Sequence, residues 1–437
     1  MSTSSNKTKS ILDKLGISRL NQMQEESRSI ILSNKNTLVL SPTGSGKTLA
    51  FLLPIIELID KGNNEIQALI ISPTRELAIQ IEQVTRNMGT GFKTNAVYGG
   101  RSGSKDREEL KKLPAILIGT PGRIADRIRR DNFSTDFLKI IVFDEFDKSL
   151  EIGFEDEMRE ITEQIPMDAK KIFTSATNKV SIPEFINTEN LIKLDYLKDN
   201  SSKLKLKLIA YNSNSKNQKL LEFLQHVDSQ KGIIFCNYKQ SIYDLSDYLD
   251  KNDIKHACFH GGMEQYDRER ALIKFRNNTY NILVSSDLAA RGIDIDSLNF
   301  ICHFEIPDRE EEFIHRNGRT ARMNADGTAF IFCELSKKNP DFLSNIPHEK
   351  LLVKQQNKIL EEWETLFISG GRKDKISKGD IAGFFIKKGK IDMKNVGKIE
   401  IKHDCSFVAI SHKKIDQLIF DLNNQHIKKK KIRIKKC

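Results

Sequence analysis

Short apolar runs alternate with longer amphipathic segments along most of this chain, and the pattern predicts parallel sheets covered by helices. In the first half, the apolar runs are rich in branched side chains and contain few interspersed polar residues. Such runs are typical of strands buried on both faces. We predict helices at 10–15 and 22–32, and strands at 37–40, 68–71, 115–118, 140–143 and 171–173. A βαβ succession of this kind predicts a doubly wound α/β domain.

The same pattern restarts after a polar stretch between residues 195 and 214, which is rich in Lys, Ser and Asn. This stretch is predicted to be a linker that contains one strand, at 205–210. Further strands are predicted at 232–236, 257–259, 281–284, 300–303 and 328–332. The chain should therefore hold two α/β domains in tandem.

A third, smaller unit is predicted from residue 362 onward. Its strands are expected at 365–368, 397–401, 406–410 and 431–434, with helices at 379–386 and 413–422. The order β-α-β-β-α-β is that of a split βαβ fold. The expected organisation is a disordered lead (1–9), a first α/β domain (10–197), a linker (198–206), a second α/β domain (207–345), a linker helix (346–361) and the small α+β domain (362–437).

The positive charge is concentrated in the last of these domains. The whole chain of 437 residues has a formal net charge of +11. Residues 362–437 hold 19 Lys and Arg against 9 Asp and Glu, whereas the preceding 361 residues hold 51 against 50. A basic domain on a nearly neutral body suggests a polyanionic partner. The alternative is a tail that only aids solubility.

Other bulk features argue against membrane and secreted classes. No apolar run approaches the roughly 18–20 residues of a membrane span, and the N-terminal residues are polar, without a secretory signal. The six cysteines are widely spaced, without a Cys-x-x-Cys pair. Neither a zinc site nor a disulfide framework is therefore indicated, and we expect a reducing, cytoplasmic environment and no membrane partner.

Residues 41–48, Ser-Pro-Thr-Gly-Ser-Gly-Lys-Thr, follow a predicted strand and open a predicted helix. This arrangement is a variant phosphate-binding loop, with Ser41 in place of the usual first glycine. Lys47 could reach the outer phosphates of a nucleotide, and the Thr48 hydroxyl could bind Mg²⁺. The alternative is a Gly/Ser turn with a stray lysine. The expected nucleotide-binding residues of the loop are Thr43, Gly44, Ser45, Gly46, Lys47 and Thr48.

Three acids follow the predicted strand at 140–143, in the sequence Asp144-Glu145-Phe146-Asp147. At the carboxyl end of a parallel strand, beside a phosphate loop, Asp144 would hold Mg²⁺ and Glu145 would position the attacking water. The alternative is an acidic helix N-terminus.

Beyond these two sites, a series of short motifs resembles those of the DEAD-box RNA helicases, a family with two RecA-like, P-loop NTPase domains. The resemblance covers about residues 10–335. The matching motifs occur in the family's order: Pro-Thr-Arg-Glu-Leu-Ala at 73–78, Gly-Gly at 99–100, Thr-Pro-Gly-Arg at 120–123, Ser-Ala-Thr at 175–177, Asp-Leu-Ala-Ala-Arg-Gly-Ile-Asp at 287–294 and His-Arg-Asn-Gly-Arg-Thr-Ala-Arg at 315–322.

By this resemblance, Gln24 is expected to read adenine, which makes ATP the nucleotide, and Asp294 to contact the ribose. Arg319 and Arg322 are expected to act as arginine fingers when the two domains close. A guanidinium on the developing phosphate charge can be worth about 10³–10⁵ in rate. Taken without the resemblance, the arginines could be a structural cluster.

The resemblance also assigns coupling and RNA contacts. Ser175 and Thr177 are expected to link hydrolysis to strand separation through Asp147 and His315. Contacts with the RNA backbone, which carry no base information, are expected from Thr74, Arg75, Gly100, Thr120, Arg123, Gln265, Arg268, Ser286 and Asp287.

Four positions depart from the family pattern. Phe146 replaces a small residue beside the coupling motif, which bears on unwinding more than on hydrolysis. Lys7 stands where an aromatic side chain usually stacks on adenine, Leu20 replaces proline, and Ser286 replaces threonine. The changes at Lys7 and Leu20 bear on nucleotide affinity.

The last domain resembles the RRM-like RNA-binding domain of DbpA-type helicases, which recognises a hairpin of large-subunit ribosomal RNA. Phe367 and Phe407 could stack on bases, as RRM aromatics do, or could be core residues. We expect strong contributions from Arg372, Lys373, Lys375 and the lysines at 428–431. A solvated turn is the alternative interpretation of the lysine run.

These observations predict a monomeric, Mg²⁺- and ATP-dependent RNA helicase that opens structured RNA locally. The expected substrate is a 23S ribosomal RNA hairpin or duplex, during assembly of the pre-ribosomal large subunit. An ATP-gated RNA clamp or chaperone with weak unwinding is the alternative, motivated by Phe146. A DNA helicase is disfavoured by the motifs.

Overall fold

The computed structural model describes residues 2–33, 36–100, 103–178, 181–197, 204–287, 298–320, 327–352, 363–411 and 413–437. Two compact units are distinguished by their internal contacts, one before residue 203 and one after it. Among the described residues, the helices are all too short or too polar to cross a membrane.

The first unit contains a seven-stranded sheet in the order β3-β4-β2-β5-β6-β1-β7, and every strand pair in it is parallel. Its strands are β1 (Thr37–Leu40), β2 (Ala68–Ile71), β3 (Thr94–Val97), β4 (Ile116–Gly119), β5 (Ile140–Phe143), β6 (Lys170–Ser175) and β7 (Ile192–Asp195). Its helices are α1 (Ser2–Leu15), α2 (Gln22–Leu32), α3 (Lys47–Leu58), α4 (Arg75–Asn87), α5 (Gly103–Leu110), α6 (Pro121–Arg129), α7 (Phe146–Ile152) and α8 (Glu155–Glu163).

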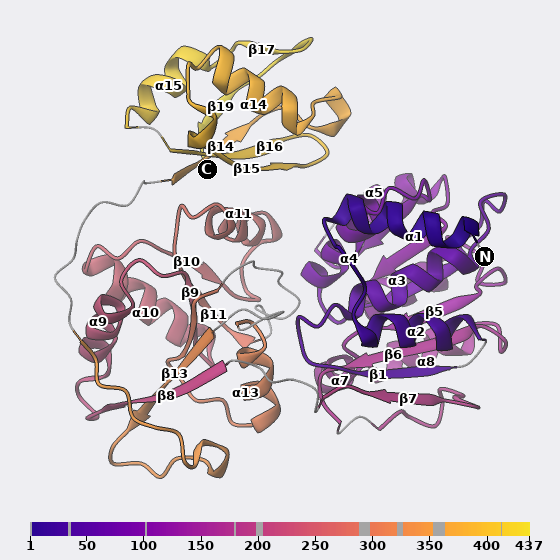
Figure 1. The fold of residues 1–437 in the computed structure, drawn as a ribbon, viewed down its shortest axis with the longest axis horizontal. Coiled ribbons are helices and arrows are strands. Elements are labelled where there is room, and N and C mark those ends of the chain that lie inside the picture. The colour runs from indigo at the N-terminus through magenta and orange to yellow at the C-terminus, as the bar shows by residue number, and fades with distance from the viewer. Residues whose placement is uncertain are drawn as a thin grey trace. The chain divides into compact units, whose positions relative to one another are not determined.

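Helices cover both faces of this sheet, as the uninterrupted apolar runs predicted (Figure 1). Helices α1 to α4 pack on one face, where Phe51 and Leu52 of α3 meet Ile70 of β2. Helices α5 to α8 pack on the other face, where Ile124 of α6 meets Ile71 and Leu117. With both faces buried, the strand ends are left as the places where polar side chains can gather.

The second unit begins with a six-stranded parallel sheet in the order β10-β11-β9-β12-β13-β8. Its strands are β8 (Leu204–Tyr211), β9 (Gly232–Phe235), β10 (His256–Phe259), β11 (Ile282–Ser285), β12 (Phe300–His303) and β13 (Gly327–Glu334). Its described helices are α9 (Lys216–Val227), α10 (Lys239–Lys251), α11 (Gln265–Arg276) and α13 (Glu310–Asn317).

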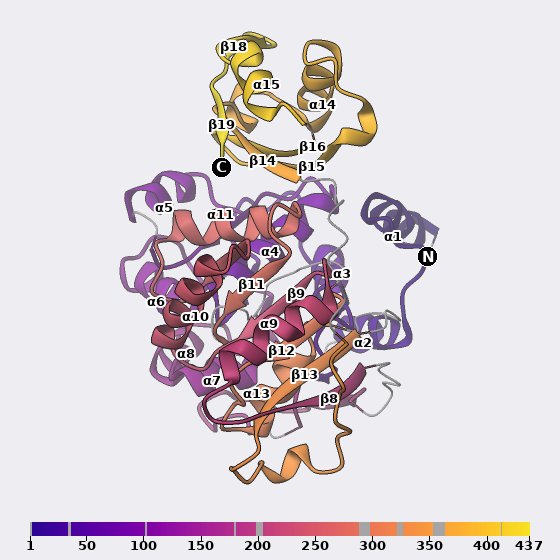
Figure 2. The ribbon, with the colours of Figure 1, turned by 90° about the vertical axis from the view of Figure 1, so that its left-hand side faces the viewer.

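The last part of the second unit is an antiparallel sheet with two helices on one face (Figure 2). The sheet has the order β15-β16-β14-β19, and a separate hairpin joins β17 to β18. The elements are β14 (Trp363–Ile368), α14 (Lys378–Lys387), β15 (Val396–Ile401), β16 (Ser406–Ser411), α15 (Ile415–Leu422), β17 (His426–Ile427), β18 (Lys430–Lys431) and β19 (Ile434–Lys436). The predicted fold class, two tandem RecA-like sheets followed by an α+β domain, is therefore confirmed.

Two predicted boundaries are wrong in detail, and a third can be compared only over its first residues. Residues 1–9 were expected to be disordered, but α1 begins at Ser2, because buried Ile11 and Leu12 anchor a helix that continues into its polar leading end. The linker at 198–206 ends early, since β8 begins at Leu204 and pairs with β13. The predicted linker helix at 346–361 lies mostly outside the described residues, and its first part is irregular.

The fourth strand of the small domain was also misplaced. Residues 431–434 were expected to form it, but β18 belongs to the hairpin with β17, and it is β19 that pairs with β14. Ile434, the first residue of β19, is buried in the core of the small domain.

Phe146, the large residue within the acidic motif, is fully buried at the start of α7. Its ring meets Phe143 at 5.7 Å and Phe173 at 5.1 Å, both edge-on. Such aromatic contacts add to the stabilisation from burial. Phe146 therefore fills the core between α7 and the sheet.

Replacing this ring should leave a cavity. We expect Phe146→Ala to lower the free energy of unfolding of the first unit by about 3–5 kcal/mol, measured by urea unfolding of the full chain. Phe137→Ala is the control, because Phe137 is 47% exposed and should change stability little. Equal effects of the two substitutions would contradict the core assignment.

Candidate functional site

The loop between β1 and α3 has the backbone shape of a phosphate cradle. Gly44 and Gly46 have φ angles of +80° and +91°, in the left-handed region that favours glycine. A Cβ on Gly46 would overlap the side-chain amide of Gln24. The loop leads directly into the N-terminus of α3, where free N–H groups and the helix dipole favour an anion.

Lys47 is the first residue of α3, and its side chain is buried. Its ammonium group donates to the carbonyls of Ser41 and Pro42, over 3.0 Å to the latter. The cation is thus held inside the loop, where phosphate oxygens would lie. Thr48 follows and is half-buried.

Gln24 lies on α2 and is hydrogen-bonded at both ends of its amide. Its Nε2 donates to the carbonyl of Gly46 over 3.1 Å, and its Oε1 accepts from the backbone N–H of Asn21 over 3.0 Å. Asn21 caps α2 and donates to the carbonyl of Ser45 over 2.9 Å. The start of α2 is therefore fastened to the phosphate loop.

Asp144 and Glu145 follow β5, two strands from the phosphate loop in the sheet order. Burial, reinforced by the neighbouring charge of Glu145, raises the pKa of Asp144 to about 6, although Thr174 and Lys47 oppose the rise. A carboxylate removed from water in this way is stabilised by a nearby cation. Glu145 is also buried, and its backbone is left-handed with φ of +46°.

The coupling residues lie at the end of the adjacent strand β6. Thr177 Oγ1 donates to Asp147 Oδ2 over 3.3 Å, and the Ser175 hydroxyl accepts from Thr177 N–H while it donates to the Thr177 carbonyl. The β1 end is joined as well, since Ser41 N–H donates to the Ser175 carbonyl over 3.0 Å. Segment 175–177 thus contacts both the acidic motif and the phosphate loop.

These groups fit a magnesium–nucleotide complex. Mg²⁺ in such sites is bound through one or two carboxylates together with substrate phosphates, and Asp144 with the Thr48 hydroxyl would supply the protein's part. Over the described ranges, no group of three or more His, Cys, Asp and Glu could hold a metal.

The RNA-contact residues predicted in the first unit lie at the other half of the same sheet edge. Thr74 and Arg75 follow β2, Gly100 follows β3, and Thr120 and Arg123 follow β4. These three strands are adjacent in the sheet. The fold thus gathers residues that are far apart in the sequence.

Arg75 illustrates how closely this region is packed. A Cβ on Gly100, whose φ is +78°, would overlap the Arg75 guanidinium. Thr74 caps α4, and its Oγ1 accepts from Leu77 N–H. The arginine therefore lies flat against the glycine backbone.

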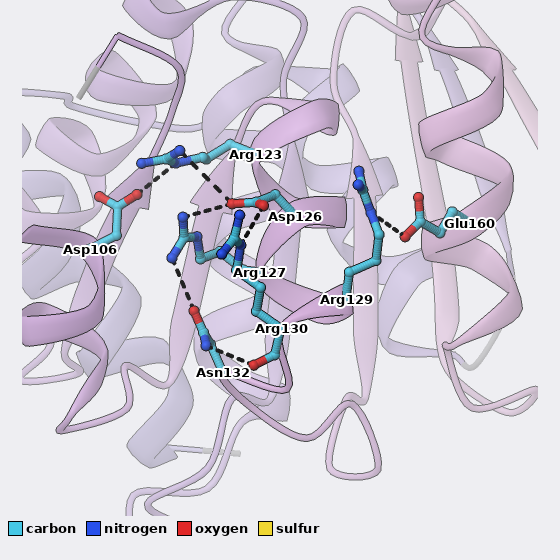
Figure 3. Close-up of polar contacts among 8 residues, drawn as sticks. All are labelled: Asp106, Arg123, Asp126, Arg127, Arg129, Arg130, Asn132 and Glu160. Atoms are coloured by element: carbon cyan, nitrogen blue, oxygen red, sulfur yellow. Dashed lines mark hydrogen bonds and ion pairs between the residues drawn. The ribbon is translucent and has the colours of Figure 1, made fainter. Parts of the chain in front are cut away.

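Arg123 belongs to a cluster of arginines on α6 and at its C-terminal end that is held by three carboxylates, of Asp106, Asp126 and Glu160 (Figure 3). Its Nε donates to Asp106 over 2.7 Å, and the Asp106 carboxylate is fully buried. Asp126 accepts from Arg127 and Arg130, each over 2.6 Å, and the hydrogen bond from Arg130 is the main cause of its lowered pKa. The guanidinium of Arg123 is thus held in place by Asp106.

In the second unit, Asp287 is bound by Arg316, which is fully buried. Arg316 Nε donates to Asp287 Oδ1 over 2.6 Å, and its other nitrogens donate to the Glu305 carbonyl and to Asn237 Oδ1 over 2.6 Å each. The Asp287 carboxylate is therefore bound inside the protein by Arg316, and this ion pair connects it to α13.

The other second-unit candidates lie at strand and helix ends. Gln265 begins α11, and the Arg268 guanidinium lies 5.0 Å over the Phe259 ring. Ser286 N–H donates to the Phe259 carbonyl over 3.4 Å. Arg319 is 5% exposed, and its Nε donates to the His315 carbonyl over 3.4 Å. Arg322 and Asp294 lie outside the described residues.

In the small domain, Phe367 and Phe407 pair across β14 and β16 with ring centroids 5.7 Å apart. Neither belongs to the cluster under α14 and α15, so they lie on the other face. On that face Thr365 is buried and bonds with Asn277 and Thr279, which follow α11. Phe407 is only 3% exposed, which favours packing over open base stacking.

Basic residues gather at one end of this small sheet. We call this group the basic end; it consists of Arg372, Lys373, Lys375, Lys402, Lys428 and Lys430. Arg372 and Lys373 N–H groups donate to the carbonyls of Lys402 and His403, over 2.9 Å each. Lys428 Nζ donates to the Lys375 carbonyl over 2.7 Å. Backbone contacts therefore join three separate loops into one positive surface.

Sequence reasoning assigned no role to four residues that hold these sites together, although Arg316 lies within the motif at 315–322. Each acts through a predicted residue: Asn21 through Gln24, Asp106 through Arg123, Thr174 through Asp144, and Arg316 through Asp287. Asn21 alone had a local signal, since Asn at 21 and Gln at 24 form a capping box. The other three contacts depend on long-range folding.

Three family models match the chain in order. They are DEAD/DEAH box helicase at residues 21–185, Helicase conserved C-terminal domain at 215–324 and DbpA RNA binding domain at 365–436.

Two relatives match over nearly the full length. The ATP-dependent RNA helicase DbpA of Bacillus subtilis (strain 168) is 30% identical over 465 residues, which cover 98% of this chain and 96% of that protein. The protein of the same name from Escherichia coli (strain K12) is 31% identical over 427 residues, covering 93% of each chain. Among solved structures, Mss116p bound to ssRNA and AMP-PNP is similar with a TM-score of 0.68 at 26% identity, over 75% of this chain and 72% of that one.

The Gln24 contacts lead to a testable expectation for nucleotide binding. Gln24→Glu removes the amide donor to the Gly46 carbonyl and places a negative charge beside the phosphate loop, so ATP affinity should fall about tenfold or more. The preference for ATP over GTP should shrink as well. Equilibrium titration with fluorescent nucleotides measures both quantities.

Gln22→Glu is the matched control, because Gln22 is exposed on the same helix. It should bind ATP as the wild type does. Unchanged affinity in the Gln24 variant would remove Gln24 from the nucleotide site.

Proposed function

The chain belongs to the DEAD-box ATP-dependent RNA helicases that carry a DbpA RNA-binding domain, and from this membership we propose that it remodels structured ribosomal RNA during assembly of the large ribosomal subunit. The observation that carries the proposal is the basic end of the small domain. It presents Arg372, Lys373 and Lys375 as exposed side chains on a backbone framework joined to two other loops.

Two features favour binding of structured RNA through this basic end. Its cations come from turns whose backbone is tied, so little order has to be created on binding. The opposite, aromatic face of the sheet is buried at Phe407 and Thr365, which makes stacking there less available than in an ordinary RRM.

In the proposed ATPase cycle, the residues of the first unit have the roles that family membership suggests. Gln24 orients the adenine, the loop N–H groups and Lys47 bind the phosphates, and Glu145 orients the attacking water. Thr48 and Asp144 would hold Mg²⁺, which neutralises phosphate charge when bound. Arg319 and Arg322, from the second unit, complete the site when the two units close on each other, with Asp294 at the ribose.

RNA is gripped through its backbone by residues of both units. Thr74, Arg75, Gly100, Thr120 and Arg123 form the first half of this surface, and Gln265, Arg268, Ser286 and Asp287 the second. Closure bends and opens a short duplex locally. Segment 175–177 couples ATP hydrolysis to Asp147 and His315. Hydrolysis then releases the RNA strand. We further propose that the enzyme works as a cytoplasmic monomer; in the described part of the chain its six cysteines are free thiols.

An ATP-gated clamp with weak unwinding is the alternative, and Phe146 was the reason to consider it. The ring packs against Phe143 and Phe173, and the Thr177–Asp147 contact is present beside it. This packing favours the helicase over the clamp. Strand-displacement assays run beside ATPase assays distinguish them, since a clamp would hydrolyse ATP without displacing any short duplex.

The catalytic assignment predicts two inactive variants. Lys47→Ala removes the cation inside the phosphate loop, and Glu145→Gln removes the carboxylate that orients water, so both should abolish RNA-stimulated ATP hydrolysis. The Glu145→Gln variant should still bind nucleotide and RNA, because the substitution keeps the fold of the protein and the carboxylate of Asp144. Wild-type turnover in either variant, or turnover of the wild type that ignores RNA, would contradict the proposal.

The substrate assignment predicts where the protein binds in cells. Crosslinking followed by sequencing of the bound RNA should recover mainly large-subunit ribosomal RNA. Arg372→Glu combined with Lys373→Glu should deplete those sites at least tenfold, since each lost phosphate contact weakens binding. Lys387→Glu is the control, an exposed lysine at the far end of α14. Scattered, non-ribosomal sites for the wild type would refute the ribosomal role.

A further inference from the structure

Thr174 lies between the two catalytic carboxylates, although no motif pointed to it. It sits near the end of β6, and its side chain is 1% exposed. Its hydroxyl donates to Asp144 Oδ1 over 2.5 Å and accepts from the backbone N–H of Glu145 over 3.1 Å. One hydroxyl group is therefore hydrogen-bonded both to the side chain of Asp144 and to the backbone of Glu145.

The two hydrogen bonds use the hydroxyl in both of its capacities, since it has one proton to donate and lone pairs to accept with. The donated bond favours the charged form of Asp144 and fixes the orientation of that carboxylate. No aliphatic side chain of the same shape could make either bond. The site thus depends on the oxygen atom, beyond the space that the side chain fills.

The accepted bond bears on an unusual backbone. Glu145 has φ of +46° and ψ of +52°, a left-handed conformation that is costly for a residue with a Cβ. Such strain persists where the surrounding structure holds it, and it is common at functional sites. Thr174 holds the N–H of this strained residue, so it helps to determine where the Glu145 side chain points.

We propose that Thr174 is the positioning residue of the hydrolytic site, which fixes the Asp144 carboxylate and the backbone of Glu145 in the geometry that hydrolysis requires. This inference rests on the proposed roles of Asp144 and Glu145. It also extends the coupling segment by one residue. Thr174 contacts Asp144 and Glu145, and Thr177 contacts Asp147 at 3.3 Å. The end of β6 therefore touches all three acids of the motif.

A pair of substitutions separates the oxygen from the volume of this side chain. Thr174→Val keeps the branched shape and removes both hydrogen bonds, whereas Thr174→Ser keeps the hydroxyl. We expect Thr174→Val to lower kcat for RNA-stimulated ATP hydrolysis on the order of 10- to 100-fold, with the KM for RNA unchanged. Thr174→Ser should restore kcat to within about threefold of the wild type.

A binding measurement gives a readout that does not depend on turnover. Titration of Mg²⁺ into each protein with a fluorescent ADP analogue should show that Thr174→Val needs several-fold more Mg²⁺ for half-maximal binding. Binding of the analogue in EDTA should match the wild type, because the phosphate loop is intact. Thr85→Val is the matched control, a buried threonine on α4 whose hydroxyl donates to the Ile81 carbonyl.

The results of these experiments distinguish failure of this inference from failure of the catalytic assignment. Wild-type kcat and Mg²⁺ requirement in Thr174→Val would overturn the inference, as would a Thr174→Ser variant as impaired as the valine. Loss of binding in EDTA as well, with a lowered melting temperature, would also overturn it by showing a purely structural role. If Glu145→Gln is inactive while Thr174→Val is normal, only this inference fails; if Glu145→Gln is active, the catalytic assignment itself fails.

Discussion

When a parallel sheet is buried on both faces, polar side chains gather where its strands end. We call the line of their carboxyl ends the carboxyl edge of the sheet. The seven strands of the first unit run in one direction, and helices cover both faces. Side chains that follow each strand therefore meet at the carboxyl edge, where helix N-termini also point. Each predicted site residue of this unit apart from Gln24 ends or follows a strand, and Gln24 reaches the edge through the phosphate loop.

Strand order divides this edge into two functions. Strands β1, β6 and β5 are neighbours and carry the phosphate loop, the coupling segment and the acids, whereas β2, β4 and β3 carry the predicted RNA contacts. Along the chain, the strands of the second set are consecutive and lie between β1 and β5. Strand β6 lies between the loop and the acids, so the end of β6 is joined to both, through Ser175 to Ser41 and through Thr174 to Asp144.

The small domain follows a different rule because its sheet is antiparallel. Loops from both directions meet at its ends, and the basic end is assembled from three of them. Its charge was evident from composition. The loop that carries Arg372 and Lys373 depends on Gly371, where a Cβ would overlap the backbone of residues 402–405. Electrostatic attraction supplies affinity in such a surface, and the fixed backbone determines which RNA shapes fit it.

By itself, the sequence determined the strands buried on both faces, the phosphate loop, the acidic motif and the basic third domain, because each depends on local periodicity, on glycine at set positions or on charge. It misjudged residues 1–9 and the last strand, where burial of Ile11, Leu12 and Ile434 by distant segments decided the outcome. It assigned no contact to Thr174, Asp106 or Arg316. The side chains with which they pair are 17 to 79 residues away, and such pairs are chosen by strand order and packing, which only the tertiary structure decides.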